Sequence, residues 1–555
     1  MRTVVSGALG ECVHVAGVSN FHRLAESASW RTVFLGPAVS IERILEAARR
    51  EKADLVGVSY RLTPDNGERL LAEFAEAADE LRTSGVRFVF GGTPPVAERA
   101  RKLGFFDACF DGTESPDQVL VYLHGGKIVG QTEVDYPQTA IGRIRWKSPF
   151  PLLRHHFGLP SIEATIQGIE EIAVSEMLDV ISLGTDQDAQ ANFFHPERQN
   201  PRRRGAGGVP VRSVEDFLTL YKASRMGNYP LLRTYTGTDD FIRLAEIFVE
   251  TIHNAWAAIP IFWFNKMDGR GPWDLEGSIR EHQKLMAWYG KRGIPVEINE
   301  PHHWGMRDAP DVLFVVAAYL SAYNARAHGV RDYITSLMFN SPAGLSDAMD
   351  LAKMLAVLEM ISELERENFH TWRQTRTGLL SYPVDSDLAR AHLAASIYLQ
   401  MALEPHIIHV VGYTEADHAA TAAEVIESCK LARRAIENAL HGQPDMTQDL
   451  AVQARKEELI REARVTLDVL SSLAPASVSD TLTDTATLTQ AVQLGILDAP
   501  QLINNPYGRG DVVSRIDGRG ACIAVDPHTG VPLSEFGRTA ALSIHHQLHH
   551  SNEEH

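Results

Sequence analysis

The chain has 555 residues, of which 44% are hydrophobic and 22% charged, and this length predicts two or more domains. A formal net charge of −18 argues against nucleic-acid or anionic-membrane partners, because these bind clustered lysine and arginine. No apolar run is long enough to cross a membrane and the N-terminus lacks a signal-peptide pattern, so we expect a cytoplasmic protein.

Residues 1–125 are predicted to form a doubly wound α/β domain of the flavodoxin or Rossmann type. Short β-rich apolar runs alternate here with segments whose apolar residues recur at helical spacing. The expected strands are 2–9, 31–36, 53–60, 87–92 and 107–112, and the expected helices are 18–29, 40–51, 67–85 and 96–104. In such a sheet, ligands bind beyond the carboxyl ends of the strands.

A second α/β series is predicted to form a (β/α)₈ TIM-like barrel over residues 161–475. Residues 126–160 are rich in proline and glycine without a sustained period, so we expect a linker there. Strand-like segments then recur with helices between them, as a barrel requires. These segments are 178–185, 229–237, 259–265, 294–300, 332–340 and 404–414.

The last part of the chain is predicted to be a smaller region, 476–540, that packs on the barrel or the cofactor. The tail 541–555 is rich in histidine, but we expect it to be disordered rather than metal-binding. The four cysteines are far apart in the sequence, which removes support for disulfides, structural zinc or an iron–sulfur cluster.

Three motifs follow predicted strands of the first domain: "CVHVAG", "VGVSYRL" and "FVFGGTPP". Their order and spacing resemble the cobalamin-binding domain of B12-dependent mutases and methyltransferases, with its D-x-H-x-x-G, S-x-L and G-G pattern. The resemblance implies that His14 ligates cobalt and that Ser59 bonds the displaced base. Its remaining implied cofactor contacts are Cys12, Val13, Gly17, Leu62, Gly91, Gly92, Gly112 and Thr113.

The first motif departs from the family at Cys12, where an aspartate is expected to orient the histidine. A metal-bound imidazole needs a partner on its other nitrogen, and either Glu11 or Cys12 is a candidate for His14. The alternative for this domain is a flavodoxin-like fold without a ligand, or a receiver-type interaction module.

The rest of the chain resembles the catalytic barrel subunit of glutamate mutase (methylaspartate mutase). The matching segments include "LDVISLGTDQDAQANF", "GNYPLL", "GIPVEINE" and "GLLSYPVDSDLARA", and the best match is "LTQAVQLGILDAPQLINNPYGRGDVVSRIDGRGACI". The resemblance implies radical chemistry that starts with homolysis of the cobalt–carbon bond of adenosylcobalamin.

Substrate contacts are implied at positions that match the family's arginines and their neighbours. The family holds two carboxylates with three arginines, for which the bidentate guanidinium fork is suited. The implied substrate-binding residues here are Arg154, Gln190, Arg233 or Arg270, Asn265 and Tyr413.

Acidic residues and histidines replace family residues elsewhere: Asp268, Glu300, His302, His303 and Asp417 are the candidate catalytic groups. Their charge favours a substrate other than glutamate, with fewer carboxylates, such as an amine, a hydroxyl compound or an amino-acid cation. The structural alternatives are a strand end with satisfied histidines for "EPHHW" and a loop ion pair between Asp268 and Arg270.

The sequence thus predicts an adenosylcobalamin-dependent carbon-skeleton mutase that acts on a small amino acid or related acid. We expect a homodimer with a small-molecule substrate. Methyltransferases of this group usually carry a four-helix cap ahead of the cobalamin domain, and this domain is predicted to begin at residue 3. A methylcobalamin-dependent methyltransferase and a non-catalytic cobalamin sensor or carrier are the alternatives. A pyridoxal-phosphate aminomutase is disfavoured, because Lys266 is the only evident candidate for a Schiff base.

Overall fold

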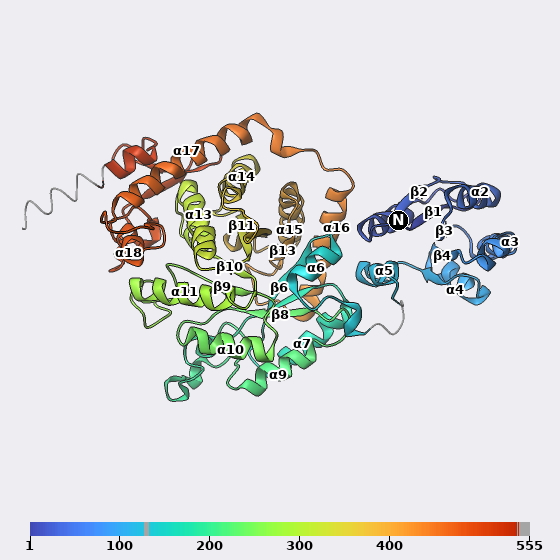
Figure 1. Cartoon of the computed structure of the whole chain (residues 1–555), viewed down its shortest axis with the longest axis horizontal. Coiled ribbons are helices and arrows are strands. Elements are labelled where there is room, and N and C mark those ends of the chain that lie inside the picture. The colour runs from blue at the N-terminus through green and yellow to red at the C-terminus, as the bar shows by residue number, and fades with distance from the viewer. Residues whose placement is uncertain (127–131, 541, 543–555) are drawn as a thin grey trace, which may run out of the picture. The chain divides into compact units, whose positions relative to one another are not determined.

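A computed structural model describes residues 1–126, 132–540 and 542, and it divides into two compact units, Met1–Pro149 and Phe150–His555 (Figure 1). The predicted disordered tail, 541–555, lies outside the described residues except for Leu542. No helix of the described part is long and apolar enough to cross a membrane.

The first unit is a five-stranded parallel sheet with the order β2-β1-β3-β4-β5. Its strands are β1 (Thr3–Ala8), β2 (Arg31–Phe34), β3 (Leu55–Tyr60), β4 (Arg87–Gly92) and β5 (Ala108–Phe110). Its helices are α1 (Ala16–Ser27), α2 (Ile41–Glu51), α3 (Pro64–Thr83), α4 (Pro94–Leu103), α5 (Pro116–Leu123) and α6 (Ala140–Lys147). All five strands and the first four helices fall where the hydrophobic pattern predicts them.

Local sequence signals explain why these helices begin where they do. The Ser40 side chain accepts from the backbone N–H of Arg43 and so caps α2. Prolines start α3, α4 and α5, where a missing N–H costs nothing. Each apolar helix face packs on the sheet around β1, β3 and β4, whose apolar residues are buried.

The second unit is an eight-stranded parallel sheet, in the order β8-β7-β6-β13-β12-β11-β10-β9, that is nearly closed into a barrel. The strands are β6 (Leu152–Phe157), β7 (Val180–Leu183), β8 (Leu231–Thr234), β9 (Ala257–Ile259), β10 (Val296–Ile298), β11 (Asp332–Phe339), β12 (His370–Thr377) and β13 (Ile407–His409). The two edge strands meet where Ala255, just before β9, donates its N–H to the carbonyl of Leu232 in β8 at 2.9 Å.

Each barrel strand is followed by a helix, which completes the (β/α)₈ pattern. The main outer helices are α7 (Ile162–Ser175), α9 (Val214–Ala223), α10 (Phe241–Thr251), α11 (Leu275–Gly290), α13 (Asp311–Ala327), α14 (Asp347–Ser362), α15 (Ser386–Gln400) and α16 (Ala422–Leu440). Short helices α8 (Gln187–Ala191) and α12 (Glu300–Gly305) lie in the loops after β7 and β10. The fold class predicted from the sequence is therefore confirmed for both units.

The boundaries predicted from the sequence differ from the structure at three strands. β6 lies inside the segment predicted as a linker. It was not predicted as a strand because it contains two histidines and an arginine and has prolines beside it. β12 was not predicted, since "HTWRQTRT" is mostly polar. The strand expected at 259–265 ends at Ile259, and the apolar residues after it are buried in a loop instead.

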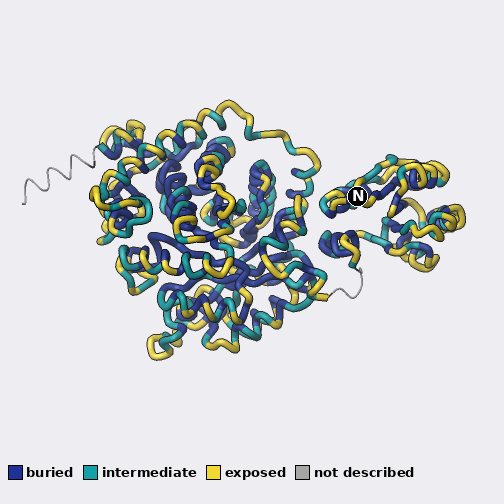
Figure 2. Tube along the Cα trace, in the orientation of Figure 1, coloured by how far each residue is buried: buried dark blue, intermediate teal, exposed yellow. Residues whose placement is uncertain are grey.

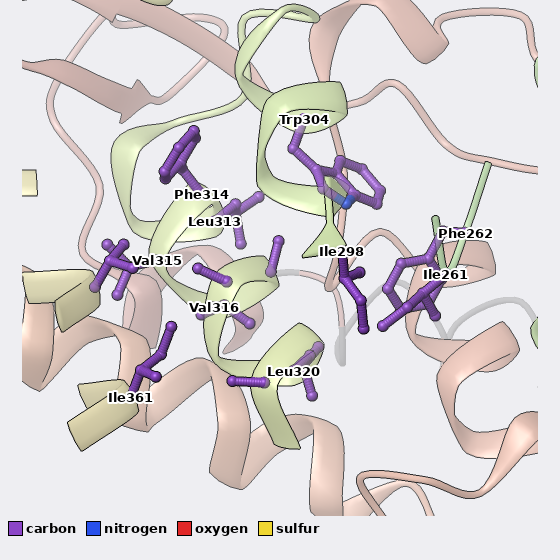
Figure 3. Close-up of a cluster of buried hydrophobic side chains, with 14 of the residues drawn as sticks. Ile261, Phe262, Ile298, Trp304, Leu313, Phe314, Val315, Val316, Leu320 and Ile361 are labelled. Carbon is purple, nitrogen blue, oxygen red and sulfur yellow. The ribbon is translucent and has the colours of Figure 1, made fainter. Parts of the chain in front are cut away.

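The core on one side of the barrel is built around α13, which is buried on nearly every side (Figure 3). Helices that are apolar all round are typical of such positions. α14 and α17 (Leu450–Ser472) pack against α13, and Figure 2 shows buried segments inside and exposed turns outside.

The region predicted at 476–540 contains α18 (Thr485–Gln493) and a two-stranded antiparallel sheet of β14 (Val513–Ile516) and β15 (Cys522–Val525). It packs on the barrel helices: Gln283 of α11 donates to the carbonyl of Thr483 at 2.7 Å. The backbone N–H of Cys522 donates to the carboxylate of Asp311, the first residue of α13, at 2.9 Å.

Candidate functional site

The carboxyl edge of the first sheet brings the predicted cofactor residues into one row. Ala8 of β1 pairs with Ser59 of β3, and Ser59 pairs with Gly91 of β4, which pairs with Phe110 of β5. The loop after β1 carries His14, whose side chain is exposed. This edge is where a parallel α/β sheet binds ligands.

Ser59 and the two glycines have different surroundings at this edge. The Ser59 hydroxyl is buried and has no hydrogen-bond partner among residues 1–126, 132–540 and 542, which is costly unless another group satisfies it. A Cβ on Gly91 would meet nothing within 4 Å, so its surface is open to a ligand. A Cβ on Gly92 would lie 2.8 Å from the carbonyl oxygen of Tyr60, so packing within the sheet already requires glycine there.

The surroundings of His14 favour Cys12 over Glu11 as the group that contacts its ring. The Cys12 Sγ is buried and lies 3.9 Å from Nδ1 of His14. Glu11 is exposed, and within the described residues it makes no hydrogen bond to the imidazole. Nε2 of His14 is thereby the nitrogen left for a metal.

The outer cofactor residues of the prediction lie on loops at the same edge. Val13 and Leu62 are 63% and 40% exposed, so two apolar side chains flank the row. Gly112 has a φ of +90°, and its loop is held by Asp111, which accepts from the Thr113 hydroxyl and forms an ion pair with Arg101 at 2.6 Å. Gly17 begins helix α1 with open space around its Cβ position.

These residues fit a cobalamin group in the chemistry that they offer. An exposed imidazole, an unsatisfied buried hydroxyl and a bare glycine backbone lie along one sheet edge. His14 would hold the cobalt, Ser59 would bond the displaced base, and the open surface at Gly91 would accept the nucleotide tail.

The barrel interior contains a second polar cluster, centred on the carboxylate of Glu297 in β10. Its Oε2 accepts from Trp256 Nε1 at 2.7 Å and lies 3.2 Å from Arg233 Nη2 and 3.3 Å from Arg154 Nη1. All four side chains are at most 2% exposed. The two guanidinium groups hold the pKa of Glu297 down to about 2 against the effect of burial, so this carboxylate is ionised.

A group of histidines lies toward the carboxyl ends of the strands. His156 of β6 stacks on Tyr235 and contacts His409 of β13. Its Nε2 lies 3.0 Å from Arg154 Nη2 and 2.9 Å from the Tyr235 hydroxyl. Because arginine only donates, Nε2 of His156 is an acceptor and the ring proton sits on Nδ1.

Burial and the arginines keep these histidines neutral. Burial and the charges of Arg376 and Arg154 together lower the pKa of His302 to about 3, although Glu297 acts in the opposite direction. The pKa values of His156 and His409 are also well below the usual value, for the same two causes. These rings offer hydrogen bonds without charge.

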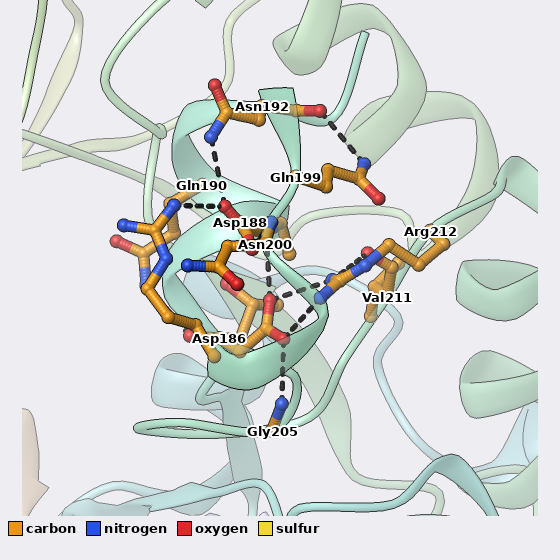
Figure 4. Close-up of polar contacts among 12 residues, drawn as sticks. Asp186, Asp188, Gln190, Asn192, Gln199, Asn200, Gly205, Val211 and Arg212 are labelled. Carbon is orange, nitrogen blue, oxygen red and sulfur yellow. Dashed lines mark hydrogen bonds and ion pairs between the residues drawn. The ribbon is translucent and has the colours of Figure 1, made fainter. Parts of the chain in front are cut away.

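Of the predicted substrate-binding residues, Arg154 and Arg233 lie in this cluster, and the predicted catalytic residues His302 and His303 lie in or beside it. Gln190 lies on α8, where its side chain donates to the carbonyl of Thr185. Figure 4 shows the polar network that holds this loop, in which Arg212 pairs with Asp186 at 2.6 Å.

The other predicted substrate and catalytic residues have partners of their own. Asp268 and Arg270 form the loop ion pair of the alternative interpretation, at 2.5 Å. The Asn265 side chain bonds Ser278 and the Phe262 carbonyl. The Tyr413 hydroxyl donates to Glu427, and Asp417 is exposed beside His418.

Glu300 also has a structural role. Its carboxylate accepts from the backbone N–H groups of Ile261 and Phe262, at 2.7 and 3.1 Å, and from Trp304 Nε1 at 2.7 Å. Burial raises its pKa to about 7. The histidines of "EPHHW" lie on α12 rather than at a strand end, and their Nε2 atoms are buried with no hydrogen-bond partner in the part of the chain that the structure describes.

Sequence reasoning missed several members of the barrel cluster: Glu297, Trp256, Ser182, Gln374, Arg376, His156, His409 and Tyr235. An ionisable residue inside an apolar strand, as in "IPVEINE", was the available signal. The residues of β6 and β12 could not be placed, because neither strand was predicted.

Comparisons with known proteins agree with the geometry of the first unit. Residues 2–121 match the family model described as "B12 binding domain". A cobalamin-binding protein from Desulfitobacterium hafniense is 21% identical over 22% of this chain and 57% of its own, with a TM-score of 0.20. The chain therefore spans little more than half the length of that protein.

Two further solved structures cover more of the chain at lower identity. A Rubisco-like protein from Rhodopseudomonas palustris is 11% identical over 56% of this chain and 70% of its own, with a TM-score of 0.33. The cobalamin-dependent S-adenosylmethionine radical enzyme OxsB is 10% identical over 89% of this chain and 73% of its own, with a TM-score of 0.18. Scores this low carry no argument about function. Residues 2–121 are thus a B12-binding domain, and the chain continues into a nearly closed (β/α)₈ barrel.

Proposed function

We propose that the protein is an adenosylcobalamin-dependent carbon-skeleton mutase that acts on a small amino acid or related acid. The observation that carries this proposal is the union, in one chain, of a B12-binding domain and a barrel with a buried polar interior. A carrier or sensor domain alone would not require such an interior. Adenosylcobalamin, when bound, supplies radical chemistry through its weak cobalt–carbon bond.

The barrel residues supply binding, orientation and exclusion of water. The side chains of Arg154, Arg233 and Glu297 are almost completely buried, so charges in this interior act in a medium of low dielectric. Their contacts with Ser182 and Gln374 fix them before a substrate enters. Such a preorganised, dry site suits a reaction whose reactive intermediates must be kept from water.

His14 is the proposed lower ligand of cobalt, and Cys12 is its proposed ring partner. A thiol is a weaker hydrogen-bond partner than the carboxylate of the family pattern. We therefore expect a less basic imidazole in this chain than one that is oriented by aspartate.

The proposal is tested with the full-length chain loaded with adenosylcobalamin that carries deuterium at the C5′ position. A panel of small amino acids and the corresponding acids is added in the dark, and mass spectrometry follows the label. A mutase is expected to transfer deuterium from the cofactor to both substrate and product. Methyl transfer would show no exchange, and a sensor or carrier would show neither exchange nor turnover.

The ligand assignment is tested separately by visible spectra of the loaded wild type and of His14→Ala. The wild type is expected to show a base-off, histidine-on spectrum that His14→Ala loses. His528→Ala is the matched control, because His528 is exposed in a loop of the second unit. An unchanged spectrum in His14→Ala would overturn the cobalt assignment.

A further inference from the structure

The resemblance to glutamate mutase implies that Arg154 and Arg233 hold carboxylates of the substrate. In the structure both guanidinium groups instead face Glu297, whose Oε2 lies 3.3 and 3.2 Å from them. This oxygen also accepts from Trp256 at 2.7 Å. A carboxylate that belongs to the protein therefore lies between the two arginines.

Arg154 has no free edge for a second anion. Its Nε donates to the Ser182 hydroxyl at 2.7 Å, and its Nη1 donates to Oε1 of Gln374 at 2.8 Å. Its Nη2 bonds His156 at 3.0 Å. Every nitrogen of the guanidinium group thus has a partner within the protein, and the bidentate fork is already occupied.

Arg376 is the arginine of this interior without a carboxylate. Gln374 and Arg376 are two residues apart on β12, so both point into the barrel, with Arg376 nearer the carboxyl end. Arg376 is only 8% exposed, and its Nε donates to the carbonyl of Thr377. Within the described residues neither of its Nη atoms donates a hydrogen bond and no carboxylate lies within 4.0 Å; the carboxylates of Glu415 and Glu297 act on it only from a longer range.

Two other polar groups of this interior also have no partner among the described residues. Nε2 of His302 and Nε2 of Gln374 are buried and make no hydrogen bond in the described chain. The charge of Arg376 contributes to the lowered pKa of both His302 and His409. A buried cation and unsatisfied donors at one end of a barrel are costly unless an anion completes them.

We propose that the barrel binds its substrate through a single carboxylate on Arg376, while Glu297 takes the place of a second substrate carboxylate between Arg154 and Arg233. This rests on the proposed function, because it names the substrate class of the same site. Glu297 acts as a specificity residue: a dicarboxylate would bring its second charge toward an ionised carboxylate. The substrate class is a monocarboxylate whose other end is neutral or cationic.

The test measures anion binding to the full chain without cobalamin, by saturation-transfer difference NMR with acetate and with succinate at constant ionic strength. Acetate is expected to give a saturable signal, and succinate to bind within a few-fold of acetate. Arg376→Gln should weaken acetate binding at least tenfold. Arg373→Gln is the matched control, since Arg373 lies on the same strand and is only partly buried near Glu404.

Glu297→Gln should strengthen succinate binding relative to acetate at least tenfold, because it removes the negative charge beside Arg154 and Arg233 that repels a second carboxylate. If this variant does not fold, the ratio of succinate to acetate affinity in the wild type tests the same point. A wild-type preference for succinate above tenfold would overturn the role of Glu297. Unchanged acetate binding in Arg376→Gln would overturn the role of Arg376.

Inorganic phosphate, added as a competitor, tests the chemistry of the anion. Phosphate should displace acetate no more effectively than succinate displaces it. If phosphate displaced acetate more effectively than succinate, the assignment of the site to a carboxylate would be overturned. Because no cobalamin is present, failure of this binding leaves the deuterium-exchange test intact. Failure of deuterium exchange likewise leaves the carboxylate measurement readable.

Discussion

Replacing Glu297 by glutamine should destabilise the second unit strongly. The pKa of Glu297 is lowered from 4.5 to about 2, and a difference of this size corresponds to roughly 3 kcal/mol of folding free energy. Removing one partner of a buried ion pair typically costs about 3–5 kcal/mol, in agreement. Two buried arginines and the Trp256 N–H would lose their anionic acceptor, and the neutral amide oxygen of glutamine cannot balance the two positive charges.

The pH dependence gives this prediction its sign. Since the folded pKa is depressed, the stabilising effect of Glu297 is present above pH 4.5 and is lost as the pH falls through 4.5 toward 2. The difference between wild type and Glu297→Gln should therefore be full at pH 7 and shrink below pH 4.5.

The assay is urea unfolding followed by tryptophan fluorescence, at pH 7, 5 and 3.5. Six of the eight tryptophans lie in the second unit, so fluorescence reports mainly on the barrel. Glu359→Gln is the control: its ion pair with Lys456 is partly exposed and should contribute less than about 1 kcal/mol. A loss below about 1 kcal/mol for Glu297→Gln at pH 7 would refute the reasoning.

Three further predictions concern single positions. Gly91→Val should leave the melting temperature unchanged but weaken cobalamin binding at least tenfold in a spectrophotometric titration. Gly92→Ala should lower the melting temperature, because its Cβ would lie 2.8 Å from the carbonyl oxygen of Tyr60. Ser59→Ala should weaken cobalamin binding about fivefold, which corresponds to one hydrogen bond of about 1 kcal/mol. The melting temperature of the cofactor-free protein should not change, and a lower melting temperature would show that the hydroxyl has a partner in the protein. Glu300, with a pKa raised to about 7, contributes stability below pH 4.5 that is lost as the pH rises through 7, so denaturant titrations of Glu300→Gln should lack this dependence.

The first unit could be predicted closely from the sequence because its strands are short apolar runs between amphipathic helices. β1, β3 and β4 are buried along most of their length, and the glycines and His14 follow them directly. Motif spacing then places the candidate cofactor residues at one sheet edge without any long-range information. The partner of His14 could not be predicted, since it depends on how the loop after β1 folds.

The barrel interior was harder to predict because its strands carry charge. A strand that buries Arg154, or Gln374 and Arg376, has the composition of a loop. Such strands are stable only because their polar groups satisfy one another across the barrel, as Arg154 does with Gln374 and Ser182. These contacts join residues up to 220 positions apart, which no local pattern reveals.

The charge of the site illustrates the same point for function. From acidic residues and histidines near strand ends, the sequence predicted a substrate with fewer carboxylates, such as an amine, a hydroxyl compound or an amino-acid cation. In the structure, Asp268 pairs with Arg270 and Glu300 accepts from backbone N–H groups. Arg376, by contrast, makes no ion pair within 4.0 Å in the described part of the chain, and its guanidinium donates only to the carbonyl of Thr377. An acidic residue indicates a cationic ligand only when no N–H or guanidinium group of the protein already occupies it. For this barrel that condition fails at Asp268 and Glu300, so under our proposal recognition should depend on the substrate's anionic end and on Arg376.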